Sequence, residues 1–260
     1  LSRLSVGGAR LLGTTNPDSP YHWLKARYLD RARELDLRHW HFTLDDNLNL
    51  DPAYVEALKL EYTGLWYKRF ILGLWAMAEG AIYDMFRDDV NTVSNNDLPD
   101  TFLKRFIGID FGQGNPTTFL KFGLTYQDSK PVLWQYDEYY HDGRKEGSKI
   151  LPRYAMDLSN FIGDEYIDAI LIDPSALALI NQCRADGMKN IRPANNEVLE
   201  GIATVSSFLG TGRLKIVKER CPNTLREYNS HIWDAKAQLR GEDKPLKEHD
   251  HCMDATRYVC

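Results

Sequence analysis

Three aspartates stand in places from which they could hold a divalent metal ion. Asp110 ends the apolar stretch 105–109, and Asp173 ends a second apolar stretch, 169–172. Asp254 lies in an acid- and histidine-rich segment near the C-terminus. A lone carboxylate among apolar residues is costly to bury unless something pairs with it. Because Mg²⁺ prefers carboxylate oxygens and keeps positions open for phosphate, three converging aspartates predict a metal site that handles phosphate esters.

Phosphodiester hydrolysis is the reaction that such a site suits. Two ions about 4 Å apart activate a water molecule and stabilise the leaving oxygen. We expect Asp110 to bridge the two ions, with Asp173 and Asp254 as further ligands. His251 precedes Asp254 by three residues, so the two share a helix face, and His251 is expected as a ligand of the second ion or as a proton shuttle. The alternatives are a turn-capping role for Asp110 and a structural role for His251 at the helix start.

The composition limits the class of protein. At 260 residues, with 43% hydrophobic and 27% charged residues, the chain can form one large domain or one and a half smaller ones. A net charge of −5 argues against a protein that coats nucleic acid by bulk charge, but it leaves room for a local basic groove. No apolar run reaches about 18 residues, so no membrane span is expected. The start has neither Met nor an apolar signal core, as expected of an excised fragment.

The cysteines do not indicate a zinc site. The four of them form no C-x-x-C pair, so reduced thiols in a cytosol are expected. His249, His251 and Cys252 follow one another on one helical turn, from which their side chains cannot converge tetrahedrally.

The elements that must position the aspartates follow a recognisable order. The polar segment 88–101 is expected to be a linker. After it, a strand that ends at Asp110 and strands at 117–124 and 132–140 form an antiparallel meander. Helices are then expected at 147–162, 176–186, 197–209 and 222–237, strands at 169–173, 191–194 and 214–217, and a last helix carries Asp254. This is the order of a ribonuclease H-like α/β domain, a mixed sheet flanked by helices.

The residues before the linker are expected to form short elements. Strands are predicted at 9–12 and 37–44, a helix at 21–35, a helix from the Asp51-Pro52 cap to about residue 62, and a further helix to about residue 74. Gly8 and Gly13 have the spacing of a phosphate-binding loop, but Thr14 stands where the phosphate-binding lysine belongs. This segment alone is therefore not a nucleotide site.

The first acidic motif, residues 108–112, is also compatible with a different enzyme, an ATPase. The stretch 108–112 also resembles the first phosphate loop of actin- and Hsp70-like ATPases. Those proteins place paired glycines after their second acid, whereas Pro174 and Ser175 follow Asp173 here. We keep this ATPase reading as the weaker alternative.

Several segments resemble the large terminase subunit of tailed bacteriophages and defective prophages. Residues 12–17 resemble its coupling motif, with Thr14, Thr15 and Asn16 as the coupling residues, and residues 73–83 resemble the region between its ATPase and nuclease domains. The three nuclease motifs are matched by 109–112, 172–173 and 250–258. The last, Asp-His-Cys-Met-Asp-Ala-Thr-Arg-Tyr, is the most specific, and together the segments cover nearly the whole chain.

The resemblance implies a domain plan and an activity. Residues 1–87 would be the C-terminal part of the ATPase domain with a helical linker region, 88–101 a linker, and 102–260 a ribonuclease H-like nuclease domain. Walker A and B motifs are absent, so ATP would bind only to the full-length protein and this chain is not expected to hydrolyse it. The nuclease would cut concatemeric viral DNA with two Mg²⁺ or Mn²⁺ ions. The alternative is a non-catalytic assembly module that docks on the portal.

The same resemblance implies the partners and the place of action. Double-stranded DNA, the phage portal protein and the small terminase subunit would be the partners, and no membrane is involved. The chain would work in the host bacterial cytoplasm, transiently at the procapsid portal.

Contact with DNA is expected to be electrostatic and tolerant of sequence. The candidate residues are Arg213, Lys215, Lys218, Arg220, Lys236, Arg240, Lys244 and Lys247. For each of them, an ordinary solvated surface position is the alternative. The position of residues 241–247 suggests a hairpin that gates the acidic cluster.

Overall fold

The centre of the molecule is a seven-stranded mixed sheet. The computed structural model describes residues 7–112 and 114–260, and the first six residues of the predicted N-terminal domain lie outside this part of the chain. The strands are β2 (Lys104–Asp110), β3 (Thr117–Gln127), β4 (Lys130–His141), β5 (Ala169–Ile172), β6 (Ile191–Pro193), β7 (Leu214–Val217) and β1 (Thr92–Val93). Their order is β1-β7-β4-β3-β2-β5-β6, and the predicted meander β2-β3-β4 is confirmed.

The sequence explains both the meander and the parallel strands on its two sides. The β3–β4 turn places Asp128 and Ser129 at φ angles of 50° and 62°, the pair of positive angles that a two-residue hairpin requires. The strands β5 and β6 run parallel to β2, and β7 and β1 run parallel to β4, because helical crossovers connect most of them. The predicted mixed α/β sheet flanked by helices is therefore confirmed.

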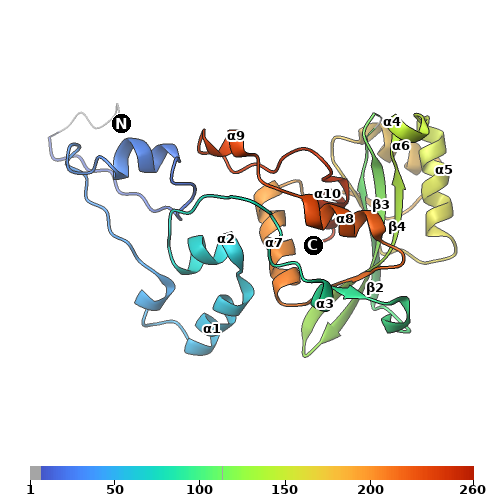
Figure 1. Ribbon diagram of the computed structural model, residues 1–260, viewed down its shortest axis with the longest axis horizontal. Coiled ribbons are helices and arrows are strands. Elements are labelled where there is room, and N and C mark those ends of the chain that lie inside the picture. The colour runs from blue at the N-terminus through green and yellow to red at the C-terminus, as the bar shows by residue number, and fades with distance from the viewer. Residues whose placement is uncertain (1–6, 113) are drawn as a thin grey trace.

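Helices cover both faces of the sheet (Figure 1). One face carries α5 (Leu151–Ile162) and α6 (Leu177–Ala185), which pack on the buried side chains of Ile107, Ile109 and Phe119. The other face carries α7 (Val198–Gly210), α8 (Pro222–Ser230) and α10 (His251–Arg257). The short helices α4 (Gly143–Glu146) and α9 (Ala235–Gln238) complete this half of the chain. All these helices lie within or near the predicted ranges, although α8 ends seven residues early.

Alternation along β2 determines which of its residues meet α10. Successive side chains of a strand point to opposite faces, so Ile107 and Ile109 face α5 while Gly108 and Asp110 face α10. A Cβ atom on Gly108 would overlap the carbonyl oxygen of Ala255 in α10. The glycine therefore lets α10 lie directly on the strand that ends in Asp110.

The N-terminal part departs most from the prediction. The expected strands at 9–12 and 37–44 are wrong, and of the helix expected at 21–35 only the π-helical turn η1 (Lys25–Leu29) forms, preceded by two helical residues. A strand needs a partner to bond its backbone, and no described strand lies beside these segments. Their large apolar side chains stay exposed, at 86% for Leu12 and 76% for Phe42.

The helices predicted after residue 50 do form. The helix α1 (Pro52–Glu61) begins as predicted, and the Asp51 carboxylate accepts a 2.8 Å hydrogen bond from the backbone N–H of Ala53. It is followed by α2 (Gly64–Trp66) and η3 (Tyr67–Ile71), within the predicted second helix. A short 3₁₀ turn, η2 (Leu44–Asp46), precedes them.

The polar segment 88–101 has its own structure. It contains α3 (Asp88–Asn91), the strand β1 and the 3₁₀ turn η4 (Asn95–Asp97). Asn91 is fully buried and its side-chain amide donates to the carbonyls of Leu209 and Leu214. The first half of this segment is therefore built into the sheet rather than free as a connector, because its polar side chains satisfy buried backbone groups.

Two further expectations can be compared with the structure. The segment 241–247 is not a hairpin of its own, since its one bridge joins Pro245 to Trp233. No helix in the described part of the chain is long and apolar enough to cross a membrane.

Candidate active site

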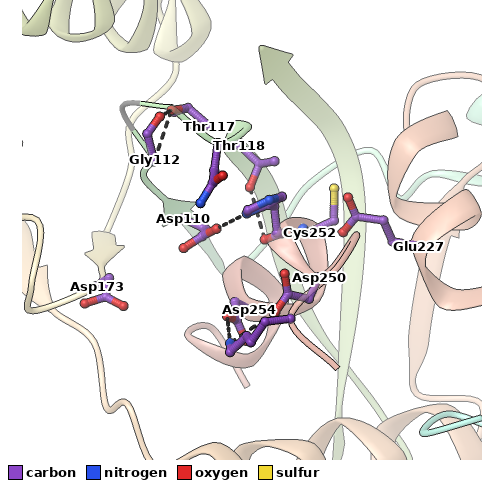
Figure 2. Close-up of polar contacts among 12 residues, drawn as sticks. Asp110, Gly112, Thr117, Thr118, Asp173, Glu227, Asp250, Cys252 and Asp254 are labelled. Atoms are coloured by element: carbon purple, nitrogen blue, oxygen red, sulfur yellow. Dashed lines mark hydrogen bonds and ion pairs between the residues drawn. The ribbon is translucent and has the colours of Figure 1, made fainter. Parts of the chain in front are cut away.

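The three predicted aspartates line one cleft. Asp110 ends β2, Asp173 directly follows the neighbouring parallel strand β5, and Asp254 lies on α10, which packs across β2. The cleft has a volume of about 720 Å³, and all three aspartates contribute to its lining together with His251. Figure 2 shows Asp173 set apart from Asp110 and Asp254.

Asp110 and His251 form a close pair. The His251 Nδ1 atom lies 2.7 Å from the Asp110 Oδ2 atom, and both side chains are 16% exposed. Burial raises the pKa of the Asp110 carboxyl, and the hydrogen bond from His251 only partly opposes this. Burial by itself would lower the pKa of His251, but the bond to Asp110 and its charge outweigh burial and raise it. The pair therefore favours a protonated imidazole that orients the carboxylate.

Asp173 is held by neutral donors. The Tyr258 hydroxyl donates to its Oδ2 atom at 2.8 Å, and the Ser175 backbone N–H donates to its Oδ1 atom at 2.6 Å. Burial raises the pKa of the Asp173 carboxyl, but these hydrogen bonds outweigh burial and lower it overall. Asp173 is therefore a carboxylate at neutral pH, and among the described residues it forms no ion pair, although the charge of Arg257 also lowers its pKa.

Asp254 is held by two cations. The Lys247 Nζ atom lies 2.9 Å from its Oδ2 atom, and an Arg257 guanidinium nitrogen lies 2.9 Å from its Oδ1 atom. Lys247 also lies 3.1 Å from the Oδ2 atom of Asp250. Arg257 is buried, whereas the Lys247 side chain is 63% exposed. Lys247 is therefore the partner that can leave Asp254 easily.

The four predicted residues share the cleft but do not meet at one point. Among the residues that the structure describes, no three acidic, histidine or cysteine side chains lie close enough to hold one ion. The donors themselves suit a hard divalent cation, because they are carboxylates from three different elements. Both oxygens of Asp254 already contact a cation, Oδ2 the Lys247 ammonium and Oδ1 the Arg257 guanidinium, so a metal ion at Asp254 would have to displace one of them.

The predicted DNA-contact residues are mostly elsewhere. Of the eight, only Lys247 lines the cleft. Arg213 stacks on Phe208 in a second cleft, and Lys215 donates to the Val90 carbonyl at 2.7 Å. Lys244 pairs with Glu242 at 2.7 Å. The clustering of basic residues in the sequence did not indicate which of them face the acids.

Sequence reasoning missed three cations that do line the cleft, Arg144, Lys145 and Arg226. Arg144 on α4 donates to the Gly114 carbonyl at 3.0 Å and to the Asn115 side chain at 2.5 Å, next to the end of β2. Arg226 on α8 lies over the Tyr140 ring at 5.6 Å. They are isolated in sequence from the acidic motifs, so only the fold brings them there.

A fourth carboxyl, Glu227 on α8, was also missed. It is fully buried behind the start of α10, where its Oε2 atom accepts a 2.7 Å hydrogen bond from the Cys252 backbone N–H and its Oε1 atom accepts one from the Tyr140 hydroxyl (Figure 2). Burial raises the pKa of Glu227 to about 7. Glu227 therefore fixes the N-terminal end of the helix that carries His251 and Asp254.

Replacing Glu227 by glutamine is expected to make stability less dependent on pH. A carboxyl whose pKa is raised on folding stabilises the fold below its unfolded pKa and loses that contribution as pH rises to about 7. Glu227→Gln should therefore be more stable than the parent at pH 8 by up to about 3 kcal/mol, with a smaller difference at pH 5. Urea unfolding at the two pH values measures this, and equal differences at both would contradict it.

No family model and no curated protein matches the chain, whereas several solved structures do. The large terminase of a thermophilic bacteriophage, solved in complex with ATP-gamma-S, is 43% identical with a TM-score of 0.92. The match covers 99% of this chain and 64% of that one, so the chain spans less than two thirds of that large terminase.

Two nuclease-domain structures share the fold at lower identity. The P22 large terminase nuclease domain is 18% identical over 70% of this chain and 92% of that domain, with a TM-score of 0.55. The large terminase nuclease domain of bacteriophage SPP1, solved with bound Mn, is 19% identical over 70% of this chain and 97% of that domain, with a TM-score of 0.50. These likenesses confirm the predicted ribonuclease H-like fold class.

Proposed function

We propose that this chain, which resembles a phage large terminase over 99% of its length, cuts double-stranded DNA by metal-dependent phosphodiester hydrolysis. The observation that carries the proposal is the shared cleft: aspartates from a strand, a neighbouring strand end and a helix face the same space. The whole protein would belong to a phage DNA-packaging terminase and cut concatemeric viral DNA. The presence of Mn in the SPP1 nuclease structure supports a divalent metal here.

Each residue of the cleft has a role in this proposal. Asp110, Asp173 and Asp254 would hold two Mg²⁺ or Mn²⁺ ions, with Asp110 shared between them. His251 donates to the Asp110 carboxylate and so fixes the direction of its second oxygen. Tyr258 does the same for Asp173. When bound, the two ions supply an activated water molecule and neutralise charge on the leaving oxygen.

Basic side chains that line the cleft would bind the phosphate groups of the DNA backbone and so position the DNA. Arg144, Lys145, Arg226 and Lys247 line the same cleft as the carboxylates, and Arg226 forms no ion pair with any described acid. A phosphodiester drawn to these cations would lie beside the aspartates. Contacts of this kind give affinity without sequence preference.

Replacing Arg226 by glutamine is expected to weaken DNA binding about three- to tenfold at low salt and to reduce the salt-dependence slope by about 1. The matched control is Lys236→Gln, another exposed cation, which does not line the cleft. Binding of a short duplex in EDTA, measured from about 50 to about 200 mM salt, gives both slopes. Equal weakening of DNA binding by the two substitutions would show that the DNA backbone does not lie in the cleft.

The remaining parts of the proposal concern the whole protein. Residues 1–87 would be the C-terminal part of an ATPase domain with a helical linker region, 88–101 a linker and 102–260 the nuclease domain. Thr14, Thr15 and Asn16 would be coupling residues, and Thr15 and Asn16 do line a second cleft that α7 also lines. ATP would bind the full-length protein, as ATP-gamma-S binds the large terminase of the thermophilic bacteriophage.

The partners and the place of action complete this reading. The portal protein and the small terminase subunit would be the partners, in the host bacterial cytoplasm and transiently at the procapsid portal. A non-catalytic module that docks on the portal is the second candidate, favoured by the two cations that neutralise Asp254 in this structure.

Mn²⁺ is expected to raise the melting temperature of the chain. Carboxylates that share a cleft repel one another, and an ion that binds only the folded state stabilises it by about 2.7 kcal/mol at 100 times its Kd. This corresponds to a rise of roughly 5 °C or more. Asp173→Asn should remove most of the rise. Asp128→Asn, in the β3–β4 turn where asparagine suits the positive φ, should keep it. An unchanged melting temperature of the parent in millimolar Mn²⁺ would count against the metal site.

A further inference from the structure

An ionic bridge centred on the buried side chain of Arg69 joins three distant parts of the chain, and of its two carboxylates Asp243 is buried whereas Asp18 is 42% exposed. Arg69 lies in η3 with its side chain 3% exposed. Its Nη1 atom pairs with the Asp18 Oδ1 atom at 3.0 Å and also with the Asp243 Oδ2 atom. Its Nε and Nη2 atoms donate to the Ala76 carbonyl at 3.1 and 2.6 Å. The Asp243 side chain is 1% exposed, so this contact is sealed from water.

The bridge fastens the loop 239–250, which connects α9 to α10. Asp243 is the charged anchor of this loop. Next to it, Gly241 has a φ of 76° and lies so close to the N-terminal segment that a Cβ atom would be 2.5 Å from the Tyr21 carbonyl oxygen. Further along, the Leu246 N–H donates to the Ile232 carbonyl at 2.9 Å. The loop is therefore held on both sides of Asp243.

The other end of the loop reaches the candidate active site. Lys247 comes four residues after Asp243 and lies against Asp254 and Asp250. At the opposite end of the bridge, Asp18 follows the predicted coupling residue Asn16 by two positions. A continuous series of contacts thus runs from the N-terminal segment through Arg69 to the carboxylate on α10.

We propose that the Asp18–Arg69–Asp243 bridge positions Lys247 on Asp254 and thereby controls whether that carboxylate is open to a metal ion. Arg69 and Asp243 act as positioning residues, because they reach the cleft only through the loop. A single guanidinium holds both aspartates, so a shift of the segment around Asp18 alters the anchoring of the loop. The proposed effect on metal binding rests on the proposed function, whereas the proposed anchoring of the loop by Asp243 does not.

The physical basis is the cost of separating buried charges. A guanidinium presents several donors in a rigid fork, and removing one carboxylate from it leaves the loop without its sealed contact. The Lys247 side chain, in contrast, is 63% exposed, although the two carboxylates that it contacts, Asp254 and Asp250, are 14% and 7% exposed. The backbone between Asp243 and Lys247 is also bonded to residues 232–234, so the Asp243 anchor acts on the position of Lys247 together with these bonds.

Asp243→Asn tests the fastening without any metal. The substitution keeps the shape and leaves Arg69 paired with Asp18. Hydrogen exchange of the bonded Leu246 and Glu248 amides within 244–250 is expected to rise by about tenfold or more, while the meander β2–β4 keeps its protection. The matched control is Glu242→Gln, the adjacent acid, which pairs only with the exposed Lys244 and Arg240 and should change nothing. Unchanged exchange at 244–250 in folded Asp243→Asn would overturn the proposal.

Calorimetric measurement of Mn²⁺ binding tests whether the loop controls the access of a metal ion to the Asp254 carboxylate. Asp243→Asn is expected to bind Mn²⁺ at least about threefold more tightly than the parent, because Lys247 leaves Asp254 more often. In a Lys247→Met background the same substitution should have no further effect, since it acts through Lys247. A threefold gain in Mn²⁺ affinity that persists in the Lys247→Met background would show that Asp243 does not act through Lys247, and it would overturn this part of the proposal. If no variant bound Mn²⁺, the proposed metal site would fail, while the exchange result would still decide the fastening.

Discussion

Replacing Gly108 by alanine is expected to destabilise the chain by about 3 kcal/mol, the upper part of the range for overpacking a core. A Cβ atom there would overlap the Ala255 carbonyl oxygen and lie 2.9 Å from the Val259 Cγ2 atom. Backbone cannot rotate away as a side chain can, so α10 must move off β2. That movement would also separate His251 and Asp254 from Asp110, and Mn²⁺ binding should weaken with it.

Urea unfolding of the purified variant measures the loss of stability. The control is Gly114→Ala, where a Cβ atom would meet nothing within 4 Å. Gly114→Ala should stay within about 0.5 kcal/mol of the parent. Equal stability of the two variants would show that α10 does not lie on β2 as closely as the structure places it.

Replacing Asp110 by asparagine is expected to reduce DNA cleavage by about 1,000-fold or more, since a metal-bound site supplies several kcal/mol of transition-state stabilisation. Asparagine keeps the size of the side chain and can still accept the hydrogen bond from His251, but it removes the charge that would bind both ions. The metal-free fold should keep its stability within about 1 kcal/mol, because burial already raises the pKa of the Asp110 carboxyl and so disfavours its charge.

Single-turnover cleavage of a linear duplex compares Asp110→Asn with the parent, and Asp128→Asn at the β3–β4 turn is the control with the same chemical change. The control should cleave like the parent. An Asp110→Asn protein that is folded and fully active would remove Asp110 from the site and would favour the turn-capping role instead.

Features of the individual strands could be predicted from the sequence because they depend on residues that are neighbours in the chain. The apolar-rich stretches of β2, β3 and β4 and the acids at the ends of β2 and β5 are visible in the residues themselves, although β3 is buried at seven successive positions and does not alternate. The adjacency of Asp110 and Asp173 then follows from the parallel pairing of β2 with β5.

Other features depend on contacts that no local pattern contains. The N-terminal strands were predicted from a short apolar run at 9–12 and from an alternating pattern at 37–44, but Leu11 and Leu12 remain exposed at 71% and 86% without a sheet to join. The pairing of Lys247 with Asp254 and the burial of Glu227 behind α10 depend on where loops and helices meet across the fold. For the same reason, only Lys247 of the eight predicted basic residues lines the cleft, and Arg144, Lys145 and Arg226 were not predicted.

The most direct test of the central claim is cleavage of supercoiled plasmid by the purified chain in Mn²⁺, in Mg²⁺ and in EDTA, beside Asp254→Ala. We expect nicked and linear products with either metal, none in EDTA, and none from the Asp254→Ala protein, which should remain folded. A folded parent that leaves the plasmid intact with both metals, or a variant that cuts as well as the parent, would contradict the assignment of this cleft as a nuclease site.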